Sequence, residues 1–139
     1  MNLPRLAVRR PITTAMIPPE QIRFLSKDSS PEVLLALMKE SGHTRYPVSK
    51  SADATDIFAY IVTKKAVPAT HAELAHLMAQ AKPVRTVDHR ATLMTGLHTM
   101  LQNKEHLLAV VDGQNQCVGI VTLEDIAGEL LSADIGEFR

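Results

Sequence analysis

An internal repeat limits what this chain can fold into. Two segments, "YIVTKKAV" (60–67) and "GIVTLEDI" (119–126), each join an apolar strand pattern to a threonine and a helix-like continuation. A short strand, a helix and a further strand are predicted before each segment, so each copy has the order β-α-β-β-α. Neither copy has enough strands to cover its own apolar helix faces. The sequence therefore predicts an α+β fold in which the two repeats pack as a pseudo-twofold pair.

The helices of both copies have clear start and stop signals or apolar faces. In the first copy, Ser30 is the predicted N-cap, Pro31 occupies the first turn and Gly42 ends the helix. In the second copy, the helix predicted over 91–103 has one apolar face, formed by Leu93, Leu97, Met100 and Leu101. The predicted strands are residues 22–25, 45–49 and 57–63 in the first copy, and 84–87, 107–112 and 117–122 in the second.

A further helix is predicted between the copies, over residues 70–81. Thr70 and Glu73 have the spacing of a capping box, and an apolar face follows, formed by Leu74, Leu77, Met78 and Ala81. We expect this helix to pack between or across the repeats. The predicted organisation is a linker or lead-in at 1–15, a first repeat at 16–67, the connecting helix at 68–82, a second repeat at 83–132 and a C-terminal tail at 133–139.

The composition is that of an ordinary soluble protein. Apolar residues make up 45% of the chain and charged residues 22%, and 15 basic residues balance 15 acidic ones, so nothing indicates binding to nucleic acid or to an anionic membrane. The single cysteine, Cys117, lies in an apolar run where we expect a buried thiol in a reducing compartment. No stretch approaches the roughly 18 apolar residues of a membrane span. We expect a cytoplasmic protein or the cytoplasmic portion of a membrane protein.

Thr122 and Asp125 allow two interpretations. Thr122 stands between a strand and a helix, so its hydroxyl can cap the helix while Asp125 reaches back from the third helical position. The same groups suit a nucleotide, because a helix N-terminus and a hydroxyl favour phosphate and a carboxylate accepts hydrogen bonds from a ribose diol. Gly119 would leave the strand edge open to a ring. The residues by themselves leave both interpretations open.

These segments also resemble a known family. The doubled unit, "SGHTRYPVS" (41–49) and "GIVTLEDI" together look like a tandem pair of cystathionine-β-synthase-type (CBS) domains, a Bateman module. More narrowly, "ESGHTRYPV" and "VVD…VGIVTLEDI" resemble the CBS pair of the magnesium/cobalt efflux and haemolysin-like (CNNM-type) transporters, over about residues 12–132. The resemblance implies a regulatory module that binds an adenosine nucleotide (ATP, ADP or AMP, with or without magnesium) in the cleft between the repeats, and no redox cofactor.

The resemblance also implies a ligand site, with Asp125 on the ribose and Thr122 near the phosphates. Because Glu124 would repel phosphate, a cation is needed, and Arg45 is the first candidate and Arg85 the second. The alternative for Arg45 is a solvated position on the surface without a ligand, which is the more common environment of an arginine. The predicted nucleotide-binding residues are Ile17, His43, Thr44, Arg45, Tyr46, Gly119, Thr122 and Asp125.

The sequence departs from the family at several positions. Pro19 stands where the family usually has a basic residue. When the two repeated segments are aligned, Thr63 corresponds to the threonine of the second copy, but Ala66 replaces its aspartate and Tyr60 its glycine. We therefore predict one competent nucleotide site and one degenerate site.

Other kinds of chemistry find no support in the sequence. His71 and His76, the closest histidine pair on one predicted helix, are five residues apart, which does not place them on one face, and no metal site is predicted. No catalytic carboxylate pair or nucleophile elbow is present, so no enzyme is predicted. The partners implied by the resemblance are a second copy in a homodimer and a linked membrane transport domain for magnesium or cobalt. The alternative is a ligand-free structural dimerisation module.

Overall fold

The computed structural model describes residues 9–63 and 70–137, and the side chains as far as residue 132. Its contacts divide the chain into two units. We call Glu20–Val84 the first-repeat unit, and Met1–Pro19 together with Arg85–Arg139 the second-repeat unit. The described residues up to Pro19 are therefore grouped with the second repeat, whereas the sequence treats residues 1–15 as a lead-in and begins the first repeat at 16.

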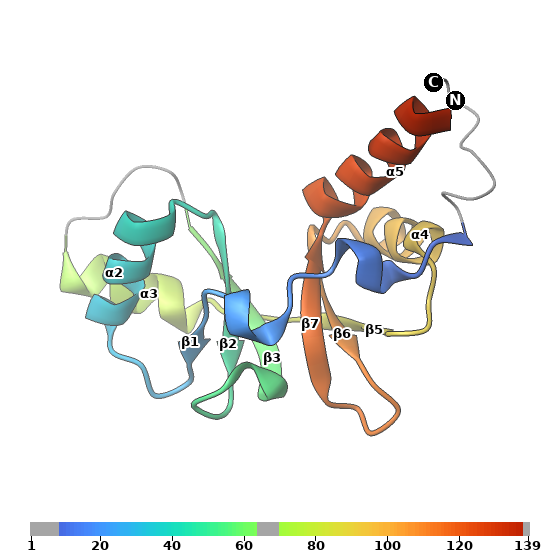
Figure 1. Ribbon diagram of the computed structural model, residues 1–139. Coiled ribbons are helices and arrows are strands. Elements are labelled where there is room, and N and C mark those ends of the chain that lie inside the picture. Colours follow the sequence, from blue (N-terminus) through green and yellow to red (C-terminus); the bar gives the residue numbers. More distant parts are fainter. Residues whose placement is uncertain (1–8, 64–69, 138–139) are drawn as a thin grey trace. The chain divides into compact units, whose positions relative to one another are not determined.

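The first-repeat unit is a mixed sheet with two helices on it (Figure 1). Its strand order is β1-β2-β3-β4, in which β1 is parallel to β2 and the other pairs are antiparallel. The elements are η2 (Pro19–Gln21, which begins at the unit boundary), β1 (Leu25–Ser26), α2 (Pro31–Ser41), β2 (Arg45–Ser49), η3 (Ala54–Asp56), β3 (Ile57–Val62), α3 (His71–Ala79) and β4 (Lys82–Pro83). The buried core consists of Leu25, Leu34, Tyr46, Val48, Ala59, Ile61 and Leu74.

The local signals of the first copy place α2 as expected. The helix begins at Pro31 after Ser30 and ends at Gly42, whose φ of 65° is the left-handed conformation that glycine adopts without strain. Ser30 occupies the N-cap position, but its side chain makes no capping hydrogen bond. The first strand is β1 at Leu25–Ser26 instead of 22–25, because these are the two residues that pair with β2.

Helix α3 corrects the prediction that it packs between or across the repeats. Thr70 caps it as expected, accepting a hydrogen bond from the N–H of Glu73 at 3.1 Å. Leu74 is only 2% exposed and lies in the same core as Leu34 of α2, so α3 is the second helix of the first-repeat unit. Ala81 is exposed and does not extend the apolar face.

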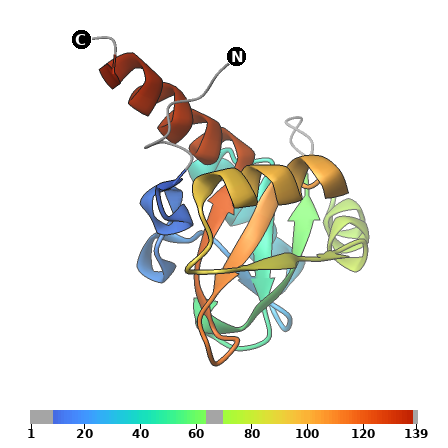
Figure 2. The ribbon, with the colours of Figure 1, turned by 90° about the vertical axis from the view of Figure 1, so that its right-hand side faces the viewer.

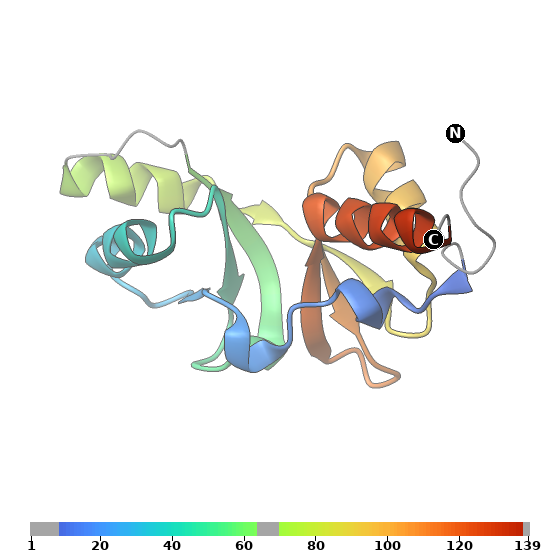
Figure 3. The same ribbon diagram turned by 45° about the horizontal axis from the view of Figure 1, so that its top comes forward.

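The second-repeat unit repeats the same order around a three-stranded mixed sheet, β5-β6-β7, in which β5 is parallel to β6 and β6 antiparallel to β7. Its elements are η1 (Ile12–Ala15), β5 (Arg85–Asp88), α4 (Leu93–Asn103), β6 (Leu107–Val111), β7 (Cys117–Thr122) and α5 (Leu123–Glu137). The short helix η1 packs against both α4 and α5 (Figure 2), and α4 packs against α5 (Figure 3). Each unit therefore has the predicted β-α-β-β-α order, and the α+β fold class is confirmed.

The apolar face of α4 differs by one position from the prediction. Leu93 and Met100 are buried and Leu97 packs against them, but Leu101 is 62% exposed. Gly96 is buried in its place. The buried stripe therefore follows the i, i+3, i+4, i+7 pattern from Leu93, and Leu101, at i+8, lies outside it.

Cys117 is a buried free thiol at the start of β7, as expected from its apolar run. Its S–H donates to the carbonyl of Gly119 at 3.1 Å, and burial raises the pKa of the thiol. None of the described helices combines the length and the apolar character needed to cross a membrane.

Candidate functional site

The site residues of the second repeat lie where three segments of one unit meet: β7, the start of α5 and the chain around Ile17. Ile17 forms an antiparallel bridge with Ile120 of β7, in which each N–H donates to the other's carbonyl, at 2.8 and 3.1 Å. β7 is an edge strand of its sheet, so the bridge satisfies backbone groups that its ladder with β6 leaves free. Both backbone polar groups of Ile17 are used, and the half-buried side chain is what remains for a ligand.

Gly119 has a structural explanation that does not involve a ligand ring. A Cβ built at this position would lie 2.7 Å from the carbonyl oxygen of Ile17, 2.5 Å from Sδ of Met16 and even closer to Cγ of Met16. Those distances are shorter than real Cβ contacts, so only glycine fits. The open strand edge that the sequence suggested is filled by Met16 and Ile17 of the same chain.

Thr122 caps helix α5. Its Oγ1 accepts a hydrogen bond from the backbone N–H of Asp125 at 3.1 Å, and the N–H of Leu123 donates to the carbonyl of His106 at 3.0 Å. Only half of the expected capping box forms, because within residues 9–63 and 70–137 no hydrogen bond or ion pair is found for the Asp125 carboxylate. A carboxylate that does not reach back to the cap is left for water or a ligand.

Capping and ligand binding do not exclude each other in this geometry. A hydroxyl has one proton to donate and two lone pairs. The Thr122 hydroxyl uses a lone pair for the cap, and among the described residues its proton has no acceptor. Thr122 can therefore donate to an anion while it caps α5, next to the partly exposed carboxylate of Asp125.

The remaining predicted residues belong to the first-repeat unit, at the start of β2. The buried Thr63 connects them, because its N–H donates to the carbonyl of Thr44 at 2.7 Å and its hydroxyl donates to the carbonyl of His43 at 3.3 Å. Arg45 is partly exposed and its Nη1 donates to Oγ1 of Thr44 at 3.4 Å. No ion pair of Arg45 is found in the described part of the chain, which leaves its charge for another partner.

Tyr46 is a core residue of the first-repeat unit. Its ring is fully buried, its hydroxyl donates to the carbonyl of Leu37 at 3.3 Å, and the hydroxyls of Tyr46 and Ser41 are 2.9 Å apart. The ring of His43, which is exposed, lies 6.0 Å from it. The aromatic side chain thus serves packing, and this differs from the expectation that it contacts a ligand.

The strand register corrects the alignment of the two copies by one residue. In each sheet one strand, β2 or β6, has a parallel neighbour on one side and an antiparallel neighbour on the other. The antiparallel pairing is irregular near the end of that strand, after Val48 in β2 and after Val110 in β6. Across the sheet, Val48 pairs with Ala59 and Val110 with Gly119, so Ala59, and not Tyr60, corresponds to the glycine.

Backbone hydrogen bonds outside the strands agree with this register. The N–H of Thr63 donates to Thr44, as the N–H of Leu123 donates to His106. Val62 therefore corresponds to Thr122, and Thr63 does not. By count along the sequence, the aspartate position falls on Lys65, which, like Ala66, lies outside the described residues. At the positions of the threonine, the aspartate and the glycine of the second copy, the first copy therefore has valine, lysine and alanine.

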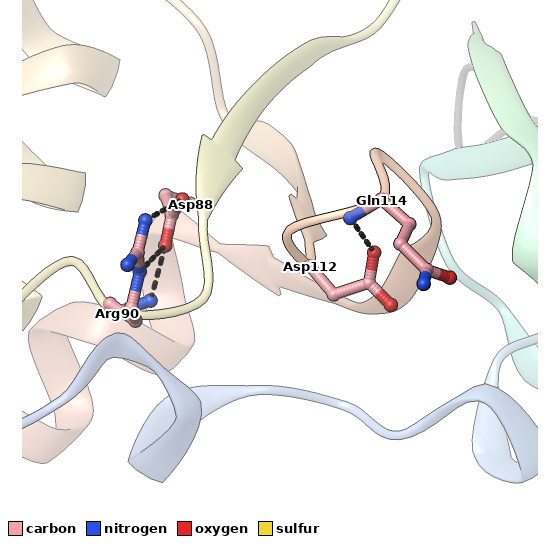
Figure 4. A network of polar contacts seen from close by, with 4 residues as sticks. All are labelled: Asp88, Arg90, Asp112 and Gln114. Carbon is pink, nitrogen blue, oxygen red and sulfur yellow. Dashed lines mark hydrogen bonds and ion pairs between the residues drawn. The ribbon is translucent and has the colours of Figure 1, made fainter.

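Two acidic groups at the other end of the second-repeat sheet serve local structure (Figure 4). The carboxylate of Asp88 accepts from Nε and Nη2 of Arg90, at 3.1 and 3.2 Å, and the Arg90 side chain lowers the pKa of Asp88 to about 2. The carboxylate of Asp112 accepts from the N–H of Gln114 at 2.9 Å in the turn between β6 and β7. No group of three or more metal-ligating side chains occurs in the parts of the chain that the structure describes.

Met16 and Ile12 were missed as structural partners of the second repeat. The prolines and arginines before Met16 show no period, which made the segment look like a linker. The available signal was a pair of isolated glycines, Gly96 in a helix pattern and Gly119 in a strand pattern, since such glycines often mark a close approach of another segment.

Comparison with known proteins supplies the family. Residues 74–132 match the family model of the CBS domain. The chain contains a CBS domain. Across 130 residues it is 29% identical to the UPF0053 protein YrkA of Bacillus subtilis, an alignment that covers 89% of this chain and 29% of that protein. The chain thus spans well under half of the curated relative that it matches.

Solved structures share the fold over nearly the whole chain. The CBS domain of the bacterial CNNM/CorC family Mg2+ transporter in complex with ATP is 24% identical, with a TM-score of 0.79 and 91% of both chains covered. A CBS-domain pair with bound AMP from Klebsiella pneumoniae is 21% identical, with a TM-score of 0.68, 88% of this chain and 98% of that chain covered. A haemolysin-like CBS protein of Oenococcus oeni is 16% identical, with a TM-score of 0.72, 90% of this chain and 93% of that chain covered. The fold is that of a CBS-domain pair, and the resemblance stated from the sequence is confirmed.

Proposed function

We propose that this chain is a regulatory CBS-pair module that binds an adenosine nucleotide, with or without magnesium, and controls a linked divalent-cation (magnesium or cobalt) transport domain or another partner domain. The observation that carries the proposal is the state of two side chains at the start of α5. Thr122 retains a hydroxyl proton to donate, and Asp125 has a carboxylate with no partner within the described residues. These are the groups that a phosphate and a ribose diol need.

The relatives support this choice of ligand. One similar structure is described with ATP and another with AMP. The register of the repeats adds a reason to expect one competent site, because the first copy has Val62 at the hydroxyl position and Lys65 at the carboxylate position. Regulation follows if the nucleotide binds two arrangements of the module with unequal affinity.

The test is a titration of the purified chain with ATP, ADP and AMP, each with and without magnesium. Calorimetry measures the binding heat, and thermal unfolding measures the shift of the melting temperature. A nucleotide at 100 times its dissociation constant should stabilise the native state by about 2.7 kcal/mol. Asp125→Asn should abolish most of the affinity. Glu124→Gln is the matched control, since it removes the same charge from the same turn of α5, and there the affinity should stay equal or rise because a repulsion is removed.

The predicted contact with the first repeat has its own variant. Arg45→Gln removes a charge that no described acid uses, so the free energy of unfolding should change little while the affinity for ATP falls. If none of the nucleotides produced binding heat or a shift of the melting temperature, the nucleotide proposal would be refuted.

The alternative is a structural dimerisation module without a ligand. It is favoured by the cap at Thr122, which forms without a nucleotide, and by two exposed leucines, Leu101 on α4 and Leu131 on α5. Sedimentation of the wild type and of a Leu101→Gln, Leu131→Gln double variant tests it. A dimer that depends on these leucines, in a chain that binds no nucleotide, would establish the alternative.

A further inference from the structure

The segment of residues 10–17, which we call the strap, is held to the second repeat by backbone hydrogen bonds at both ends. At one end the N–H of Ile12 donates to the carbonyl of Ala91, and the N–H of Leu93 donates to the carbonyl of Arg10, both at 2.8 Å. At the other end is the bridge between Ile17 and Ile120. The strap is thus fixed to the helical layer and to the edge of the sheet of the same unit.

Two glycines on different elements provide the space for the strap. A Cβ at Gly96 of α4 would lie 2.5 Å from Cδ1 of Ile12, and a Cβ at Gly119 of β7 would collide with Met16 and with the carbonyl of Ile17. Ile12 is fully buried in the core that it shares with α4 and α5. Both glycines therefore serve the docking of one segment that is far from them in the sequence.

The docked strap ends beside the proposed nucleotide site. Ile17 is bonded to Ile120, two residues before Thr122 on the same strand. The half-buried side chain of Ile17 offers an apolar surface that suits an adenine ring, whereas Thr122 and Asp125 offer the polar groups. When the strap leaves β7, the apolar part of this arrangement leaves with it.

We propose that the strap is a docking segment that completes the nucleotide site, that Gly119 is the residue that positions Ile17 there, and that strap docking and nucleotide binding strengthen each other. The coupling rests on the proposed function, whereas the docking stands on the contacts above. Linkage requires reciprocity: if undocking lowers the affinity for ATP by a given factor, ATP raises the docking equilibrium by the same factor. A change at the strap is then transmitted to the ligand site, and a ligand is sensed at the strap.

Hydrogen exchange followed by NMR tests the docking without any nucleotide. Gly119→Ala should raise the exchange rate of the Ile17 amide at least tenfold, because the backbone carbonyl at 2.7 Å cannot give way. Gly128→Ala is the matched control, since a Cβ at Gly128 meets nothing within 4 Å. The amide of Val121, inside the β6–β7 ladder, should be unchanged in both variants. An Ile17 amide as well protected in Gly119→Ala as in the wild type, or a rise at Val121 equal to that at Ile17, would overturn the docking role.

The coupling is tested with ATP and magnesium on the same proteins. The affinity should fall at least tenfold in Gly119→Ala and stay unchanged in Gly128→Ala, and saturating ATP should slow exchange at Ile17 in the wild type by a similar factor. If the wild type binds ATP and Gly119→Ala binds it with an affinity within twofold of the wild type, the coupling is overturned and the proposed function stands. A wild type that binds none of the three nucleotides overturns both, while the exchange data still decide the docking.

A second variant covers the case in which Gly119→Ala does not fold. Gly96→Ala pushes mainly against the flexible end of Ile12, at 2.5 Å from Cδ1, and less closely against Cδ1 of Ile126 at 3.1 Å. It lies on α4, a helix with no proposed contact to the ligand. It should speed exchange of the Ile12 amide at least threefold and lower the affinity for ATP, a loss that cannot come from a clash with the ligand. Unchanged affinity together with faster strap exchange would contradict the coupling.

Discussion

Replacement of Thr122 by valine separates the cap of α5 from the carboxylate beside it. Valine keeps the β-branched shape that the end of β7 accommodates, but removes the oxygen that accepts the N–H of Asp125 at 3.1 Å. Loss of an N-cap costs about 0.5–2 kcal/mol of stability, typically about 1 kcal/mol. Asp125→Asn keeps the backbone N–H and the cap, and loses only the interaction of a partly exposed carboxylate with the helix dipole, about 0.3–1 kcal/mol. We therefore expect Thr122→Val to be the more destabilising of the two.

The assay has to report on the second-repeat unit. The chain has no tryptophan, and both of its tyrosines, Tyr46 and Tyr60, lie in the first-repeat unit, so tyrosine fluorescence follows the other repeat. Amide exchange at Val121 and Ile126, in the core of the second-repeat unit, measures the opening of the relevant part. A loss of about 1 kcal/mol raises the open population about fivefold.

Two comparisons complete the experiment. Thr122→Ser keeps the hydroxyl and should retain most of the stability and the ATP affinity that Thr122→Val loses. If Asp125→Asn without nucleotide destabilised the unit as much as Thr122→Val, the carboxylate would belong to the cap, and the reasoning from an unused Asp125 side chain would be refuted.

Three further outcomes follow from the described contacts. Tyr46→Phe should cost about 1 kcal/mol of stability, because it removes the hydroxyl that bonds within the core, and should leave ATP affinity unchanged; urea unfolding and calorimetry measure the two effects. Arg90→Gln should raise the pKa of Asp88 from about 2 toward its ordinary value of 3.8, as read by NMR titration. Since the fold favours the ionised form of Asp88, its stabilising contribution is complete above pH 3.8 in the wild type and is lost as the pH falls through about 2, so an acid titration of the variant should lack this step. The thiol of Cys117 should resist an exposed-thiol reagent in the native state and react once urea unfolds the chain, and rapid native labelling would contradict its burial.

The local elements of the fold are readable from short stretches of sequence. Pro31 and Gly42 bound α2, and Thr70 and Thr122 accept the capping hydrogen bonds of α3 and α5, because start and stop signals act within one or two turns of a helix. The strand β7 occupies the predicted residues, since its apolar run is bounded by turn residues on one side and a cap on the other. The repeat itself gave the β-α-β-β-α order of both units.

The candidate site follows from the sequence less completely than the fold does. The cap at Thr122 is confirmed, because a hydroxyl and an acid three residues apart at a strand-to-helix junction form a local pattern, whereas ligand binding by Thr122 and Asp125 stays a prediction. The sequence does not show whether the ring of Tyr46 packs in the core or contacts a ligand, since an aromatic residue next to Arg45 is compatible with both. Its burial against Leu37 and Ser41 is a tertiary fact.

The sequence by itself determined the order of the main elements of this protein, the caps at Thr70 and Thr122, and the family whose motifs the chain carries. Only the tertiary structure decided that α3 packs on α2, that Val62 corresponds to Thr122, and that a segment with a linker's composition docks onto Gly96 and Gly119. The physical reason is the range of the interactions. Caps and apolar periods act between residues a few positions apart, whereas strand register and the space beside a glycine depend on which distant segment arrives there.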